Sequence, residues 1–277
     1  MQGSSFGISD LLMKFLMRRR LPVLPIAVLA AFAHCLFSAE DSPAEAPPAG
    51  DARALVQRAF DYMRGNASIG VFTMTIHRPE WERSQTLKAW TEGEKNSVFV
   101  ITDPPQDRGN GTLKQGNQMW TFNPKINRVI KLPPSMMSQA WMGSDFTNND
   151  LAKSDSILSD YTHEFVGTER EGGHAAHRIR STPREGAPVV WGYKELLIRD
   201  DNIFLEEAYF DQDGRLVKTL QARQIELIGE RLLPRINIMI QADDPERFTR
   251  IVYDELEFLE ELPPNTITQA FLRNPDY

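Results

Sequence analysis

The chain has 277 residues, of which 41% are hydrophobic and 25% are charged, a composition typical of a globular protein with a buried core. Its formal net charge of −7 argues against nucleic acid or an anionic membrane surface as a partner. The length fits one large β domain or two small domains.

The first 39 residues are predicted to be a signal peptide, outside the fold. Three arginines at 18–20 precede an apolar run at 21–37, which two prolines and a histidine interrupt. This run is too short and too interrupted for a stable membrane span. We expect cleavage after Ala39, and therefore a protein that is exported to the periplasm.

Cleavage after Ala39 would remove the single cysteine, Cys35, and leave no disulfide, reactive thiolate or cysteine metal site. Lipid anchoring through Cys35 is the disfavoured alternative, because His34 before it is neither small nor apolar, as a lipobox residue should be. Residues 40–50 are rich in proline, alanine and acidic residues, which predicts a disordered leader. The folded domain is expected at residues 51–277.

One amphipathic helix is predicted at the start of this domain, over residues 51–65. Asp51 can cap its N-terminus and Gly65 can end it. The apolar residues that recur on one face of this helix are Leu55, Val56, Ala59, Phe60 and Met63. This face must pack against another element, which we expect to be a β-sheet.

From Ile69 onward a period of two replaces the helical period, and turn residues separate the alternating runs. About a dozen strands are predicted, mostly in sequential hairpins, at 69–77, 85–92, 97–102, 118–122, 126–132, 161–168, 175–181, 189–199, 203–211, 215–227, 232–241 and 248–258. Residues 148–159 are predicted to be helical or irregular. Antiparallel strands with one apolar face curl into a barrel or half-barrel, and the amphipathic helix would cover its mouth.

The segment after Pro133-Pro134 has an unusual composition, with five large apolar side chains within eleven residues. They are Met136, Met137, Trp141, Met142 and Phe146, and no single strand or helix period accounts for them. One interpretation is a flexible lid that fits apolar partners of varied shape, since methionine is adaptable and polarisable. The other interpretation is a loop that plugs one end of a β core. The sequence favours neither.

The sequence contains no motif that predicts a catalytic, metal or cofactor site. His174 and His177 have the spacing of helical metal ligands, but they follow Gly172-Gly173 at the start of a predicted strand, where they would point to opposite faces. The acidic residues in 211–214 fit a hairpin turn better than a calcium loop. No nucleophile elbow, P-loop or Rossmann glycine pattern occurs.

Four stretches carry a resemblance to a known family: MTIHRPEW at 74–81, WTEGEKNS at 90–97, GTLKQGNQMWTFNPKINRVIKLPPSMMSQAWMGSDFTNNDL at 111–151 and APVVWG at 187–192. They resemble the bacterial outer-membrane lipoprotein-sorting proteins, relatives of the periplasmic lipoprotein carrier LolA. The resemblance covers residues 51–277. It implies an incomplete, half-open antiparallel β-barrel, closed at its mouth by the N-terminal helix and a mid-chain helical or loop lid, around a hydrophobic cavity for acyl chains.

The resulting hypothesis is a non-catalytic periplasmic carrier of lipid or acylated lipoprotein, monomeric, with an inner-membrane transporter of the ABC or RND type as its partner. Ordinary core packing is the competing interpretation for the strand residues of its predicted cavity and lid. The predicted ligand-binding residues are Trp90, Phe99, Trp120, Phe122, Met136, Met137, Trp141, Met142 and Trp191. Two alternatives remain open: a transporter adaptor subunit without cargo, and a periplasmic hydrolase.

Overall fold

The computed structural model describes residues 50–276, so the predicted signal peptide, Cys35 and most of the predicted leader lie outside the described residues. One antiparallel sheet of 13 strands dominates this range, and its two edge strands do not pair with each other. The predicted fold class, a mainly β, half-open antiparallel barrel, is confirmed. None of the helices in residues 50–276 is long and apolar enough to cross a bilayer.

The strands follow each other as hairpins in chain order, apart from one long connection after the sixth. The strands are β1 (Ala67–Arg78), β2 (Trp81–Glu92), β3 (Asn96–Asp103), β4 (Gly111–Gln115), β5 (Gln118–Asn123), β6 (Arg128–Lys131), β7 (Tyr161–Glu171), β8 (His174–Pro183), β9 (Tyr193–Arg199), β10 (Phe204–Phe210), β11 (Leu216–Ile228), β12 (Arg231–Gln241) and β13 (Phe248–Leu259). The helical elements are α1 (Ala52–Arg64), η1 (Pro134–Met136), η2 (Trp141–Gly143), α2 (Asn148–Ala152), α3 (Ser156–Ser159) and α4 (Gln269–Arg273).

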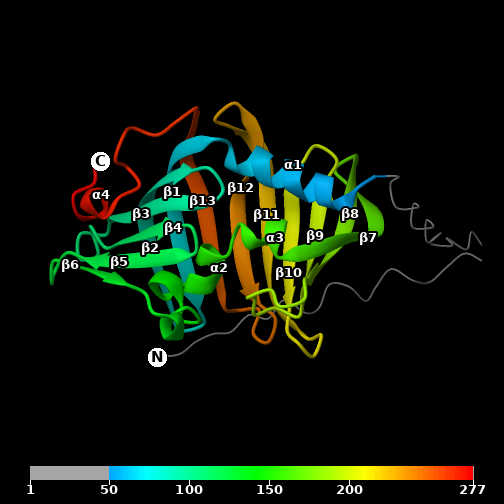
Figure 1. Cartoon of the computed structure of the whole chain (residues 1–277), viewed down its shortest axis with the longest axis horizontal. Helices are drawn as coiled ribbons and strands as arrows, with labels where there is room; N and C mark the ends of the chain where they lie inside the picture. The colour runs from blue at the N-terminus through cyan, green and yellow to red at the C-terminus, as the bar shows by residue number, and fades with distance from the viewer. Residues whose placement is uncertain (1–49, 277) are drawn as a thin grey trace, which may run out of the picture. The chain divides into compact units, whose positions relative to one another are not determined.

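The order of strands in the sheet is β6-β5-β4-β3-β2-β1-β13-β12-β11-β10-β9-β8-β7. β1 and β13 pair in the middle, whereas β6 and β7, which are consecutive in the chain, form opposite edges. Residues 132–160, here called the crossing segment, must therefore traverse the face of the curved sheet. Figure 1 shows its helices α2 and α3 lying in front of the strands. We call the face that they cover the inner face.

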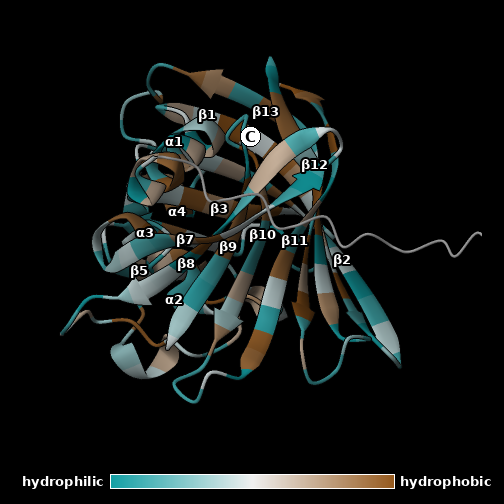
Figure 2. Ribbon diagram, turned by 90° about the vertical axis from the view of Figure 1, so that its right-hand side faces the viewer, coloured by the Kyte–Doolittle hydropathy of each residue, from teal (hydrophilic) through white to brown (hydrophobic). Residues whose placement is uncertain are grey.

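Helix α1 forms where the sequence predicts it and packs on the inner face beside α3. The Asp51 side chain accepts a hydrogen bond from the backbone N–H of Arg53 at 2.9 Å, and Gly65 ends the helix with φ +65°. The buried side of the helix, at Leu55, Val56 and Ala59, joins a cluster with residues of α3, β7, β8 and β9. Figure 2 shows α1 and α3 on the same side of strands β9 to β11.

The outer face of the sheet is also covered over part of its width. The C-terminal residues Leu262, Phe271 and Leu272 pack against Trp90 and its strand neighbours, with the Trp90 and Phe271 rings edge to face at 5.0 Å. Gly111 allows this approach, because a Cβ there would stand 2.7 Å from Leu272. The half of the sheet made of β1 to β6 therefore has an apolar layer on each face.

Three buried carboxylates, five residues apart, fasten the crossing segment to the sheet. Arg78 of β1 binds Asp145 through both terminal nitrogens at 3.0 Å. Lys218 of β11 lies 2.5 Å from Asp150. The third pair joins Lys114 of β4 to Asp155 at 2.8 Å. Each base comes from a different strand, so the three pairs set where the segment runs across the inner face.

We expect Asp145→Ala to destabilise the protein strongly, because it leaves the charge of Arg78 buried without a counter-ion. The loss of unfolding free energy should be about 3–5 kcal/mol, measured by urea denaturation. The matched control is Asp213→Ala, which removes a carboxylate paired at 3.7 Å with Arg215 on the surface and should cost roughly 0–1 kcal/mol. Adding Arg78→Met to Asp145→Ala should recover part of the lost stability. Equal losses in Asp145→Ala and Asp213→Ala would contradict the role of Asp145 in fastening the crossing segment.

We also expect His163 to make the protein less stable in mild acid. Burial, reinforced by the positive charges of Arg53 and Arg184, lowers the pKa of His163 below 6.5. Between the two pKa values the unfolded chain binds a proton at His163 and the native state does not. The contribution of His163 to the free energy of unfolding is therefore fully present above pH 6.5 and is lost as the pH falls toward the pKa of the folded state.

The measurement is the free energy of unfolding as a function of pH, from 7 down to about 5. The slope of this curve is proportional to the number of protons taken up on unfolding, and one such histidine adds at most about one proton. His163→Gln should flatten the curve in this range. His174→Gln, at an exposed histidine, serves as the control variant. An unchanged slope in the His163 variant would count against the assignment.

Candidate functional site

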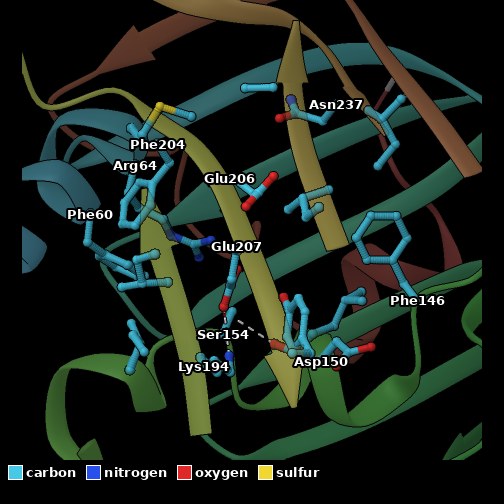
Figure 3. Close-up of a pocket in the computed structure, with 18 of the residues that line it drawn as sticks. Phe60, Arg64, Phe146, Asp150, Ser154, Lys194, Phe204, Glu206, Glu207 and Asn237 are labelled. Carbon is cyan, nitrogen blue, oxygen red and sulfur yellow. Dashed lines mark hydrogen bonds and ion pairs between the residues drawn. The ribbon is translucent and has the colours of Figure 1, made fainter. Parts of the chain in front are cut away.

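A pocket lies between the inner face of the sheet and the helices that cross it. Its volume is about 380 Å³, within the roughly 300–1,000 Å³ of small-ligand sites, and it is partly open to solvent. Residues of α1, α2 and α3 line it together with residues of β3, β4 and β9 to β13 (Figure 3). The pocket exists because the crossing segment passes over the sheet without filling the space beneath it.

Most of the pocket wall is apolar. The aromatic and aliphatic side chains that form it include Phe60, Phe99, Phe146, Phe204, Leu196 and Leu220. Small or short side chains stand between them at Ser97, Ser154 and Ala222, and they leave the volume that larger residues would occupy. Water held against such a wall is readily displaced by hydrocarbon, so the shape and chemistry suit an apolar ligand.

One end of the wall carries a buried ion pair. Lys194 Nζ lies 2.8 Å from Glu207 Oε1 and 4.7 Å from the ring centre of Tyr209. Burial opposes the charge on Lys194, but attraction to Glu207 and Tyr161 outweighs it and raises the pKa of Lys194. Burial, together with the charge of Glu207, raises the pKa of Tyr209 well above its ordinary value, so the phenol stays neutral.

A second polar region, here called the basic corner, consists of Arg64, Ser97 and Lys114. Arg64 is the last residue of α1, and its Nη2 donates to Asn96 O at 2.9 Å and Ser97 Oγ at 3.0 Å. Lys114 stands opposite Ser97 in the β3–β4 pairing and contacts Asp155. Burial lowers the pKa of Arg64 and of Lys114, and attraction to Asp155 opposes the lowering in both.

Of the nine predicted ligand-binding residues, only Phe99 is among the residues that line the pocket. Trp90, Trp120 and Phe122 instead belong to the cluster on the outer face, under the C-terminal segment. These three side chains therefore face away from this pocket. The physical reason is that neighbouring strand residues point to opposite faces, and both faces are apolar here, so alternation could not tell which face is hollow.

The methionine-rich stretch also lies outside the pocket wall. Trp141 is buried, with its ring 5.4 Å from that of Phe99 and its Nε1 donating to Thr112 Oγ1 at 3.0 Å. Met137 and Met142 pack against the same cluster, and Met136 is half-buried. Of the two interpretations of this stretch, the loop that plugs a β core matches these contacts, because Trp141 fills the inner face between β1 and β4.

Trp191 lies beside the pocket but does not line it. Its ring packs edge to face on Tyr209 at 5.1 Å, and Lys218 Nζ lies 5.3 Å from its centre. The tryptophan covers the buried charges from outside. It therefore shields the polar end of the pocket.

The histidines that the sequence singled out lie away from the pocket. His174 Nδ1 is 2.8 Å from Asp200 Oδ1 on an exposed turn, and Asp201 stands close enough to form a cluster with them. Arg199 already binds both oxygens of Asp201, at 2.8 and 2.7 Å. Hydrogen bonds and ion pairs hold these side chains at the turn.

The residues that line the pocket on β9, β10 and β11 were missed because they have the pattern of ordinary inward-facing strand residues. A signal was nevertheless present. Lys194 is in phase with Leu196 and Ile198, and Arg64 follows Phe60 by four residues on the apolar side of its helix. A charged residue in phase with apolar ones indicates a polar group inside the fold.

A family model described as "Uncharacterized protein" matches residues 93–274. A search of the curated proteins found no match.

Three solved structures are similar over 80% of this chain. A DUF1329 family protein from Desulfovibrio piger has 21% identity and a TM-score of 0.72, with 97% of that chain covered. A domain from Vibrio parahaemolyticus described as an outer membrane lipoprotein-sorting protein has 16% identity, a TM-score of 0.68 and 98% coverage. A LolA superfamily protein from Nitrosomonas europaea has 21% identity, a TM-score of 0.66 and 100% coverage. The predicted LolA-like fold is confirmed.

We expect Trp141→Ala to act on stability, because the ring is part of the core between the crossing segment and the sheet. The loss should be about 3–5 kcal/mol of unfolding free energy, measured by urea denaturation. Trp81→Ala, which removes a ring that is 49% exposed, is the control and should change stability by less than about 1 kcal/mol. A stable Trp141 variant that only loses ligand would restore the lid interpretation.

Proposed function

The chain belongs to the family described as "Uncharacterized protein", whose model covers residues 93–274, and we propose that it is a periplasmic binding or carrier protein for a lipid or lipoprotein acyl chain. The observation that carries this proposal is the pocket of about 380 Å³ with its apolar wall. Each methylene group taken out of water contributes about 0.8 kcal/mol, so a chain of several carbons would be held firmly.

The architecture supports a role in binding. A pocket on the open face of a sheet is bounded on one side by short helices of the crossing segment, so a ligand can enter between elements without breaking the sheet. The similar domain from Vibrio parahaemolyticus is described as lipoprotein-sorting, which agrees in kind with an acyl cargo. An export partner of the ABC or RND type would receive or deliver this cargo at the inner membrane.

The pocket chemistry gives less support to the hydrolase alternative. Its wall includes Ser97 and Ser154, but no histidine is among the residues that line it. Ser97 Oγ is engaged as the acceptor of the Arg64 hydrogen bond. A serine nucleophile with a histidine base is therefore not assembled in the pocket.

We expect protein purified from a bacterial host to carry lipid that mass spectrometry detects in an organic extract. Ala222→Trp should lower the lipid content severalfold, because the indole would fill space beside Asn237 on the next strand. Ala270→Trp, on the exposed side of α4, is the matched control and should leave the content unchanged. Melting curves of both variants establish that they fold.

The outcome that contradicts the proposal is an extract without lipid, together with no uptake of the neutral fluorescent probe N-phenyl-1-naphthylamine by the purified protein. That result would favour the adaptor alternative, in which the chain contacts a transporter and carries no cargo. Equal lipid content in wild-type protein and in Ala222→Trp would show that lipid binds elsewhere on the molecule.

A further inference from the structure

The charged groups around the pocket are paired, with one exception. Lys194 binds Glu207 at 2.8 Å and Lys218 binds Asp150 at 2.5 Å. Two further pairs, Arg178 with Glu206 at 3.3 Å and Lys114 with Asp155 at 2.8 Å, complete the set. Arg64 alone among the cations that line the pocket forms no ion pair with any carboxylate of residues 50–276.

The hydrogen bonds of Arg64 go only to neutral acceptors. Its Nε donates to Gly93 O at 2.7 Å, and its Nη2 donates to Asn96 O and Ser97 Oγ. Its Nη1 has no hydrogen-bond acceptor among the described residues. In Figure 3 the guanidinium extends from α1 into the pocket. These bonds fix the plane of the guanidinium and leave one of its nitrogens available for a ligand.

The neighbours of Arg64 add further donors. Lys114 Nζ donates to Lys95 O at 3.0 Å and to Asp155 at 2.8 Å, which uses two of its three protons. The hydroxyl proton of Ser97 is free to be donated, since Ser97 Oγ accepts from Arg64. The basic corner thus presents donors from three side chains. Asp155 is the acid that most strongly offsets the charge of Arg64, and Lys114 already shares it.

The apolar wall begins directly beside this corner. Phe60 and Met63 of the same helix line the pocket, and Phe204 of β10 lies close to Phe60 (Figure 3). A ligand that places an acidic group at Arg64 would therefore have its hydrocarbon part against these side chains. The free acceptor in the pocket, Asp150 Oδ1, has no hydrogen-bond donor among the described residues and would repel an anion. The acidic group is thus assigned to the basic corner.

We propose that Arg64, with Ser97 and Lys114, binds the acidic group of an anionic amphiphile whose hydrocarbon chain occupies the apolar pocket. This inference rests on the proposed function and adds to it the chemical class of the ligand. The acidic group is a carboxylate or a phosphate, both of which suit a guanidinium. A fatty acid and a lysophospholipid are the two sources, and they share this chemistry.

The test compares ligands that share one chain and differ in the head group. Full-length chain is expressed, purified and delipidated, and N-phenyl-1-naphthylamine is displaced at pH 8 by hexadecanoate, 1-hexadecanol or hexadecyltrimethylammonium, each below its critical micelle concentration. We expect hexadecanoate to bind about ten- to a hundredfold more tightly than 1-hexadecanol, because one charge-assisted hydrogen bond changes the affinity by about this factor. Hexadecyltrimethylammonium should bind most weakly. Equal affinity for hexadecanoate and 1-hexadecanol, or preference for the cation, would overturn the proposal.

Variants of the helix assign the preference to Arg64. Arg64→Gln should bring the affinity for hexadecanoate close to that for 1-hexadecanol, while 1-hexadecanol binds as before. Arg64→Lys, which keeps the charge, should retain most of the preference. Arg58→Gln is the matched control, since Arg58 lies on the exposed side of the same helix. A preference that survives in Arg64→Gln would overturn the assignment, and the wild-type comparison remains decisive if that variant fails to fold.

Two further ligands distinguish the sources of the acidic group. Tighter binding of 1-palmitoyl-lysophosphatidate than of hexadecanoate identifies a phosphate head group, and the reverse order identifies a carboxylate; both support the proposal. Inorganic phosphate that displaces the probe as well as lysophosphatidate does would indicate a site for a free anion and overturn it. If neither 1-hexadecanol nor the probe binds, the proposed function itself fails, which is a different result from the loss of head-group preference.

Discussion

The structure depends on one constraint, which is that the chain must pass from one edge of an open sheet to the other. β6 and β7 are consecutive yet lie at opposite edges, so residues 132–160 have to cross the inner face. This segment consists of short helices and loops, so backbone hydrogen bonds of the strand type do not hold it to the sheet. It is held there by Asp145, Asp150 and Asp155, each buried against a base from a different strand. Buried pairs of this kind fix position more than they add net stability.

The crossing segment is held to the sheet at only a few points, which explains why it covers the inner face and still leaves a pocket beneath it. Near β1 to β4, Trp141 fills the face and packs on Phe99. Toward β9 to β12, short helices and α1 lie over the strands, and small side chains such as Ala222 leave space below them. The same crossing segment is thus a plug at one end and a cover at the other. An apolar cavity follows from this division, and the proposed binding role rests on that cavity.

The charges around the cavity show how a polar interior can suit an apolar ligand. A buried lysine or glutamate is tolerated when its partner is at hydrogen-bond distance, as for Lys194 and Glu207. Such pairs present little net charge to a ligand. Arg64 differs because the backbone oxygens that hold it carry no full charge. A cation without an ion pair among the described residues therefore stands beside the apolar wall.

The sequence by itself determined that the chain is mainly β and determined most of its local elements, although the predicted strands omit β4. Asp51 and Gly65 set the ends of α1, and alternation with turn residues set the hairpins, because these patterns depend on neighbours within a few residues. The family resemblance added the half-open barrel. Only the tertiary structure decided which apolar face is hollow. Trp90 and Phe99 are equally apolar strand residues, and one lies under the C-terminal segment while the other lines the pocket, since the covering elements come from distant parts of the chain.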